Sequence, residues 1–379
     1  MKINLVILHL NLIDGIGPEA IKRIIFHKDF VRNDLYSMQE NDLMAWGVSQ
    51  KQATMIVQGL KDRKLLDQEL YLIERYGIKC ITFDQDDYPF LLKQIYSPPP
   101  VLYYKGIDFF TLDKNIAVIG SRKANNYAAQ IIQSWVPSLI KANWAIVSGG
   151  AIGADTMAHQ AALSAQGKTV VVLGSGLLSP YPRSNIKMFE KIVDQGGAIV
   201  SSFALGTGPH PGNFPARNRI ISGLSRACLV VQAAKKSGAT ITAEYALEQG
   251  RMVFAVPGSV FDPLHEGCHA MIKEGAMLIS SVDELMEELG EVLPEHQHQQ
   301  DNDQVYQQQI GLISASESIL LEMEPIEQQI IRCCLNNIMS TDDLLHQIDI
   351  PLDELYDHLF NLQLAGKIEQ DALGLWRIR

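Results

Sequence analysis

The sequence has few of the features that mark a secreted, metal-binding or membrane protein. Its five cysteines are an odd number among 379 residues, and none stand in a Cys-x-x-Cys or similar ligand spacing. This argues against a disulfide framework and a zinc site, so we expect reduced, buried thiols. The apolar run at residues 1–13 is too short to cross a bilayer and lacks a secretory cleavage site. We therefore expect a cytoplasmic protein without membrane contact, metal or cofactor.

Two common phosphate-binding fingerprints and the usual catalytic patterns are also missing. Gly120-Ser121-Arg122 follows an apolar run, but it lacks the three spaced glycines of a dinucleotide site. It also lacks the Gly-Lys-Ser/Thr of a Walker A loop. No order of Ser, His and Asp and no ligand cluster indicates nucleophilic or metal chemistry. We therefore predict no catalytic residue from these patterns.

Positive charge is scarce overall, with a net charge of -11, but it is unevenly distributed. Residues 114–279 hold 15 Lys and Arg against 8 Asp and Glu, whereas residues 280–379 hold 4 against 20. Residues 1–113 are nearly balanced, with 13 against 15. A basic middle predicts an anionic ligand there, and the acidic C-terminal part is predicted to bind nucleic acid poorly.

Short apolar runs dominate the middle of the chain. Residues 116–119, 144–147, 169–173, 198–200 and 227–231 are uncharged and β-rich, which is typical of strands buried on both faces. Helix-length segments separate them. This alternation predicts an α/β fold of the Rossmann-like kind, with a doubly wound and mainly parallel sheet. We assign this Rossmann-like domain to residues 78–290.

Two smaller modules are expected on either side. Residues 1–77 read as a helical domain of the SAM or helix-hairpin-helix kind, because the turn at 12–18 contains Gly15 and Gly17. Such a hairpin either presents N–H groups to phosphate or serves only for docking. A Gln- and His-rich linker is expected at 291–315, and three helices with a β-wing predict a winged helix at 316–379.

Small and basic residues follow several of the predicted strands. The carboxyl ends of parallel strands share one sheet edge, so these loops should converge on a phosphate or a polyanion groove. One such loop alone is as easily a tight turn as a site. The predicted DNA- or phosphate-binding residues are Gly120, Ser121, Arg122, Ser148, Gly149, Gly150, Phe214, Arg217, Asn218, Arg219, Lys235, Lys236, Ser237 and Gly238.

Over about residues 85–290 these strings closely resemble the DNA-processing protein A (DprA or Smf) family. The resemblance implies a single-stranded-DNA-binding protein of natural transformation, without known catalysis. Such proteins protect incoming DNA, load RecA and form homodimers through the Rossmann-like domain. The strings that carry the resemblance are Gly120-Ser121-Arg122, Ser148-Gly149 with Gly153 and Asp155, Ala158-His159, Tyr181-Pro182, residues 211–215, Arg217-Asn218-Arg219, Ser237-Gly238, Thr242-Ala243 and residues 255–258.

The chain departs from the family pattern at three positions. Ile152 stands in place of an arginine, and Ser202 and Gln232 stand in place of glutamates. The first change implies one phosphate contact fewer. The other two make carboxylate catalysis less credible.

Two other functions stay open from the sequence. One is a Rossmann-like nucleotide-binding enzyme of the phosphoribohydrolase type, but the nearest string, residues 237–244, lacks the required glycine pair. The other is a small-nucleotide sensor that signals through the winged helix.

Overall fold

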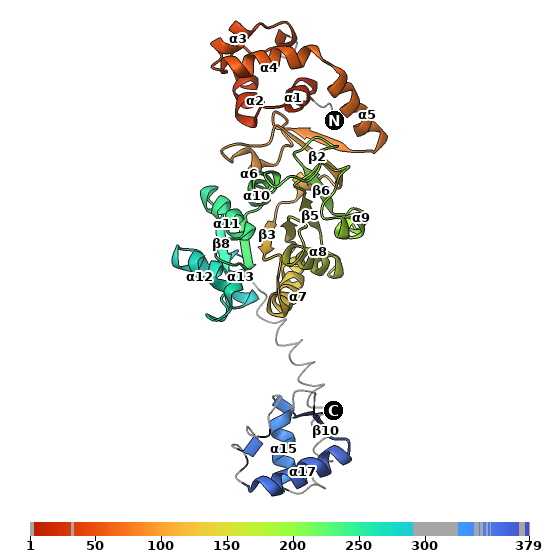
Figure 1. Cartoon of the computed structure of the whole chain (residues 1–379), viewed down its shortest axis with the longest axis vertical. Coiled ribbons are helices and arrows are strands. Elements are labelled where there is room, and N and C mark those ends of the chain that lie inside the picture. Colours follow the sequence, from red (N-terminus) through yellow and green to blue (C-terminus); the bar gives the residue numbers. More distant parts are fainter. Residues whose placement is uncertain are drawn as a thin grey trace. The chain divides into compact units, whose positions relative to one another are not determined.

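The computed structural model describes residues 4–31 and 34–290, and then 325–336, 341, 344–345, 348, 350–370 and 376–378. The chain divides into two compact units, Met1–Leu293 and Pro294–Arg379, which are described separately below. Figure 1 shows their elements in sequence colours. Within the described ranges, no helix has both the length and the apolar character needed to cross a membrane.

A nine-stranded sheet forms the centre of the first unit, in the order β1-β2-β6-β5-β4-β3-β7-β8-β9. Pairs β1–β2 and β2–β6 are antiparallel, and all the other pairs are parallel. The expected mainly parallel α/β sheet is thus confirmed. The strands are β1 (Lys79–Thr82), β2 (Val101–Gly106), β3 (Asn115–Gly120), β4 (Ala145–Ser148), β5 (Thr169–Val172), β6 (Ala198–Ser201), β7 (Ala227–Gln232), β8 (Met252–Ala255) and β9 (Met277–Leu278).

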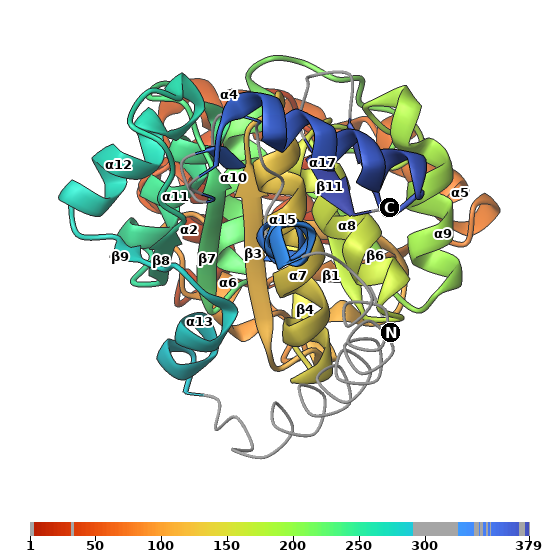
Figure 2. The ribbon, with the colours of Figure 1, turned by 90° about the horizontal axis from the view of Figure 1, so that it is seen from below.

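Strand β3 has a central role in this sheet, because the strand order reverses beside it. It pairs with β4 on one side and with β7 on the other, and β3 and β7 lie side by side in Figure 2. Alternate side chains of β3 enter two different cores. Ile116 and Val118 lie in one core, whereas Ala117 and Ile119 lie in the other. Both faces of the sheet are therefore covered, as in a doubly wound fold.

Helices cover both faces and connect the parallel strands. One core contains residues of α7, α8 and α13, and the other contains residues of α10, α11 and α12. The helices of this part are α6 (Phe90–Lys93), α7 (Asn126–Lys141), α8 (Ala154–Ser164), α9 (Ile186–Asp194), α10 (Asn213–Gly223), α11 (Gly238–Glu248), α12 (Glu266–Lys273) and α13 (Val282–Glu288), with short 3-10 turns at Phe109–Thr111, Arg183–Asn185 and Pro263–His265.

The N-terminal helices pack against the antiparallel end of the sheet. Ile7 and Ile21 belong to the same core cluster as Leu102 of β2. The predicted boundary at residue 77 falls just before β1, but the helices share a core with the strands and no second compact body separates there. These helices are α1 (Leu5–Asn11), α2 (Pro18–Ile25), α3 (Glu40–Ala45), α4 (Gln50–Lys61) and α5 (Lys64–Arg75), with a 3-10 turn at Asp34–Tyr36.

The second unit has a small core of its own. It contains α15 (Pro325–Asn336), α17 (Leu352–Leu364) and an antiparallel hairpin of β10 (Ile368–Gln370) and β11 (Trp376–Ile378). Trp376 of the hairpin is buried with Leu355 and Leu359 of α17. The expected linker at 291–315 lies outside the described residues. The second of the three helices expected in the winged helix falls at residues 340–347, and most of it also lies outside them.

Candidate nucleic-acid interface

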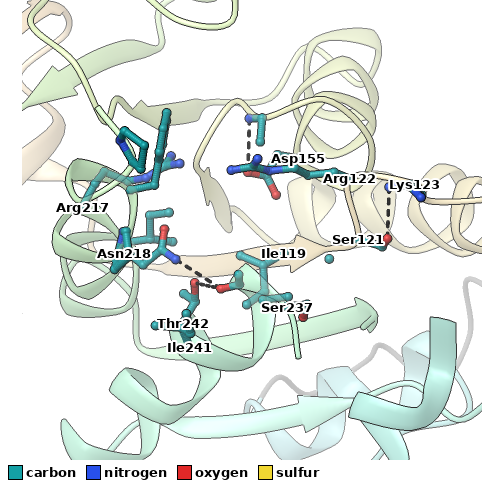
Figure 3. Close-up of a pocket in the computed structure, with 18 residues that line it drawn as sticks. Ile119, Ser121, Arg122, Lys123, Asp155, Arg217, Asn218, Ser237, Ile241 and Thr242 are labelled. Atoms are coloured by element: carbon teal, nitrogen blue, oxygen red, sulfur yellow. Dashed lines mark hydrogen bonds between the residues drawn. The ribbon is translucent and has the colours of Figure 1, made fainter. Parts of the chain in front are cut away.

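A cavity of about 560 Å³ opens where β3 and β7 end (Figure 3). Its walls are the loop after β3, the first turns of α10 and α11, and the loop that leads into α8. In open α/β sheets, ligands bind beyond the carboxyl ends of the strands at the point where the strand order reverses. The cavity occupies this point.

The loop after β3 is held by backbone contacts that leave its basic side chains outside. The strand register shifts between Ile119 and Gly120, and the Ser121 N–H donates to the Gln232 carbonyl over 2.7 Å. A Cβ at Gly120 would lie only 2.7 Å from that of Ala154, so a side chain does not fit there. Ser121 Oγ accepts the Lys123 N–H at 3.0 Å, and Arg122 and Lys123 remain exposed at the cavity.

Aromatic side chains stand beside Arg122. Its guanidinium carbon lies 5.5 Å from the centre of the Phe214 ring, and the Tyr181 ring lies 5.8 Å from that of Phe214. Tyr181 is 44% exposed and Ile152 is 57% exposed. Together with Arg122 these three side chains line a smaller hollow of about 50 Å³ next to the cavity. A cation beside accessible rings can bind a phosphate while a base stacks next to it.

The opposite wall is the start of α11. Ser237 Oγ accepts the Thr240 N–H at 3.3 Å, and Thr240 Oγ1 accepts the Ser237 N–H at 3.3 Å. Asn218 Nδ2 of α10 donates to the Gly238 carbonyl at 3.1 Å, which ties the two helices together. The first turn of a helix attracts anions through its N–H groups and the helix dipole. This turn therefore faces Arg122 across a cavity suited to negative charge.

Asp155 and Arg217 lie at the base of the cavity. Asp155 Oδ2 accepts the N–H groups of Gly149 and Ala151 at 3.2 and 3.3 Å. Arg217 Nη1 donates to the Val172 carbonyl at 2.5 Å. Burial raises the pKa of Asp155 and Arg217 opposes that rise, whereas burial lowers the pKa of Arg217 to about 10.

The structure brings most of the predicted site residues together. Eight of them line the cavity, and Gly149 lines the smaller hollow. The eight are Gly120, Ser121, Arg122, Phe214, Arg217, Asn218, Ser237 and Gly238.

Ser148, Gly150, Lys235 and Lys236 do not line either space. The Ser148 hydroxyl donates into the sheet, to the Val118 carbonyl at 2.7 Å. Gly150, at φ +66°, packs against Phe189. Lys235 and Lys236 are exposed on the turn before α11. The loops after β3 and β4 therefore differ. The loop after β3 lines the cavity, whereas Ser148 at the end of β4 and Gly150 in the loop after it contact the interior of the protein.

Arg219 is also outside both spaces. It lies two residues after Arg217, and positions i and i+2 point to nearly opposite sides of a helix. Burial lowers its pKa, while Tyr88, Tyr245 and Glu19 raise it. The expectation that both arginines face one groove does not agree with this geometry.

Lys123 and Asp155 line the cavity although they were not predicted as site residues. Lys123 follows Arg122 directly, so its charge was visible in the sequence. Asp155 was harder to identify from the sequence, because a lone carboxylate near a phosphate-binding loop does not suggest an anion site. Its position in the cavity is explained by the two backbone N–H groups that it accepts rather than by its charge.

Comparison with known proteins agrees with this architecture. Residues 79–290 match the family model of DNA recombination-mediator protein A. The chain is 32% identical over 380 residues to Protein Smf of Synechocystis sp., covering 95% of this chain and 94% of that protein. It is 40% identical over 227 residues to DNA processing protein DprA of Bacillus subtilis, covering 60% and 76%.

Two solved structures are also similar. DNA processing protein A of Streptococcus pneumoniae has a TM-score of 0.66 and 34% identity, covering 76% of this chain and 99% of that one. DNA processing protein A of Helicobacter pylori, whose structure is described in terms of its single-stranded-DNA-binding mode, has a TM-score of 0.51 and 28% identity, covering 56% and 95%. With a family match over more than half of its length and a relative that aligns almost end to end, the chain belongs to the DprA/Smf family of DNA recombination mediators.

Proposed function

We propose that this recombination mediator binds single-stranded DNA at the cavity between β3 and β7, as part of natural transformation. One observation carries the proposal. The exposed Arg122 lies at the point where the strand order reverses, 5.5 Å from the centre of the Phe214 ring. A cation and an accessible aromatic ring match the alternation of phosphate and base along a single strand. The DNA-binding mode described for the Helicobacter pylori protein supports the same ligand.

Each wall of the cavity has a role in this proposal. Arg122 and Lys123 neutralise phosphate charge, and the first turn of α11 at Ser237 and Gly238 provides N–H groups. Phe214, with Tyr181 beside it, provides the stacking surface. The volume of about 560 Å³ is within the range of small-ligand sites, so one nucleotide of the strand fits inside. Lys235 and Lys236 would extend the basic surface beyond the cavity.

The surface of the Rossmann-like domain also supports a homodimer. Val260 and Phe261, in the loop after β8, are 78% and 92% exposed, and Leu278 on the edge strand β9 is 46% exposed. Exposed apolar side chains at a sheet edge favour association with another chain. We propose that two copies meet there. We further propose that the dimer protects incoming DNA in the cytoplasm and loads RecA, as family membership suggests.

For the flanking modules we propose a SAM or helix-hairpin-helix-like domain at the N-terminus and a winged helix at the C-terminus. The winged helix would contact protein rather than DNA. On α17, Leu352, Tyr356, Phe360 and Leu364 are all exposed at intervals of four residues. An apolar stripe on an acidic module suits a protein surface better than phosphate.

A phosphoribohydrolase-type enzyme has less support. Among the described residues that line the cavity, Asp155 is the single carboxylate, and it already accepts two backbone N–H groups. Glu244, from the string nearest to that motif, does not line the cavity. A general acid or base has to reach the reacting bond, and neither carboxylate is placed for this role.

Arg122→Ala tests the proposed site, with Arg226→Ala as its matched control. Arg226 is an exposed arginine before β7, at the opposite edge of the sheet. Fluorescence anisotropy with a labelled oligonucleotide across a salt series gives the affinity and the slope of log K against log salt. Arg122→Ala should bind more weakly and lose roughly 0.7 from that slope, because one phosphate contact is removed. Arg226→Ala should change neither. Equal affinities and slopes for the two variants would place the DNA elsewhere.

A further inference from the structure

A buried pair of opposite charges lies directly under the proposed DNA-binding surface. Arg217 of α10 is 4% exposed and Asp155 of α8 is 8% exposed. Figure 3 shows Arg217 extending from α10 towards Asp155. Both charged groups flank Gly149, where a Cβ would overlap Nη1 of Arg217 and lie 2.7 Å from Oδ2 of Asp155. The pair thus holds the loop after β4 between its two members.

Arg217 connects three separate segments of the chain. It starts on α10, passes Gly149 and donates to the Val172 carbonyl at the end of β5. Phe214 is one turn earlier on the same helix, and its ring lies against Gly174, where a Cβ would be 2.8 Å away. The position of the first turn of α10, and with it the Phe214 ring, therefore depends on the Arg217 contacts.

Asp155 holds the same loop from the other side. Its Oδ2 accepts the N–H groups of Gly149 and Ala151. A free carboxylate in a phosphate-binding cavity would repel the ligand. A neighbouring guanidinium cancels that charge, so the pair together adds no net charge to the cavity. The same attraction acts on Arg217, so the negative charge of Asp155 offsets part of the positive charge of this arginine.

We propose that Asp155 and Arg217 act as a neutral pair of positioning residues, which fixes the loop after β4 and the Phe214 ring for DNA without contacting the strand. This inference rests on the proposed function. It assigns Arg217 a different role from the direct phosphate contact that its place in the sequence suggests. The pair would lower the cost of ordering the site when the strand binds, because the stacking surface is already in place.

Two variants test the pair. Asp155→Asn keeps an oxygen that can accept the two N–H groups but leaves Arg217 as an unpaired buried charge. The double variant Asp155→Asn with Arg217→Met removes both charges, which avoids the destabilisation of a broken buried pair. Arg122→Ala serves as the comparison for a direct phosphate contact. For each protein we would measure the anisotropy salt series and the hydrogen exchange of the Gly149 and Ala151 amides.

The expected results separate positioning from direct contact. Asp155→Asn should bind single strands about fivefold more weakly, with an unchanged salt slope and faster exchange of the two amides. The double variant should keep the wild-type slope although it has one arginine fewer. Arg122→Ala should lower the slope and leave the exchange unchanged.

Two results would overturn the proposal. Tighter binding by Asp155→Asn would mean that the acid simply repels phosphate. A slope lowered by roughly 0.7 in the double variant would mean that Arg217 contacts a phosphate directly. If Asp155→Asn does not fold, the salt slope of the double variant still shows whether Arg217 contacts a phosphate. If the wild-type protein does not bind single strands, the proposed function fails, and the exchange of the two amides still shows whether the pair holds the loop.

Discussion

His159, on α8 below the site, is fully buried and has a defined tautomer. The Thr169 hydroxyl donates to the Ile146 carbonyl at 2.8 Å, so its oxygen accepts the proton of His159 Nδ1 at 2.7 Å. Nε2 then carries no proton, and it has no hydrogen-bond partner. Burial, followed by the positive charge of Arg217, lowers the pKa of His159 to about 3. This histidine stays neutral in the folded protein.

We predict that His159 makes the protein less stable in mild acid. The unfolded chain binds a proton near pH 6.5 and the folded chain does so only near pH 3, so stability falls as the pH falls between these values. At pH 5 the cost is about 2 kcal/mol of unfolding free energy. Urea unfolding of wild type and His159→Gln at pH 7.5 and pH 5 measures it. The variant should lose less stability between the two pH values, and an equal loss would contradict the assigned protonation state.

The sequence predicted the residue types of the site better than their roles. Gly120-Ser121-Arg122 was identified because small residues after a buried strand indicate a loop at a sheet edge. The sequence does not distinguish Arg217 from Arg219, since spacing shows where charges fall but not how deeply a side chain is buried. The structure separates them because the helical period turns one towards the cavity base and the other towards Tyr88.

Among the elements, α5 is linked to the loop that precedes α10. Glu69 of α5 is 6% exposed, and its Oε1 accepts the Leu205 N–H at 2.8 Å. Leu205 is fully buried, and its carbonyl accepts the Leu178 N–H at 3.0 Å. One carboxylate of the N-terminal helices therefore fixes a loop of the Rossmann-like domain.

We predict that Glu69→Leu lowers the free energy of unfolding by about 1–3 kcal/mol, the cost of a buried N–H left without a partner. Glu69→Gln should cost less, because its amide oxygen can accept the same bond. Glu74→Gln, an exposed glutamate on the same helix, is the matched control and should be close to wild type. Urea denaturation of the three variants gives these values. Wild-type stability in Glu69→Leu would show that the contact has no energetic role.

The strands were more predictable than their pairing. Buried β-rich runs such as residues 227–231 predicted strands, since parallel strands covered on both faces carry few polar residues. The antiparallel pairing of β2 with β6 could not be predicted in this way. An apolar run such as Val101–Tyr104 has the same pattern in either direction, and the direction is set by how the connecting segments pack.

At the scale of the whole molecule, the sign of the net charge changes along the chain: the Rossmann-like domain is basic and the C-terminal residues are acidic. We predict that deleting residues 291–379 leaves single-strand affinity unchanged or raises it at low salt. The deleted residues carry 16 acidic against 4 basic side chains, so we expect them to repel phosphate. Anisotropy titrations at low and high salt would measure the effect, and any gain should vanish as salt screens the charges.

The control for this deletion is the folded state of the shortened protein, checked by its thermal unfolding and its oligomeric state. With both intact, a tenfold loss of affinity, about 1.4 kcal/mol, would make the C-terminal unit part of the DNA site. The charge distribution was readable from the sequence. The full winged helix was a prediction whose middle helix lies mostly outside the described residues, so it stays a proposal.

The order of strands in the sheet differs from the order in which the ribosome makes them. Arg122 follows β3, whereas Ser237 follows β7, and the chain synthesises β4, β5 and β6 between the two. Until β7 is added, one edge of β3 is unpaired, and Arg122 has no facing wall. Long-range pairing of this kind is slow, and an open apolar edge is prone to association. The proposed DNA-binding cavity is therefore completed late in synthesis, so we expect a nascent chain to bind no DNA there before most of its sheet has formed.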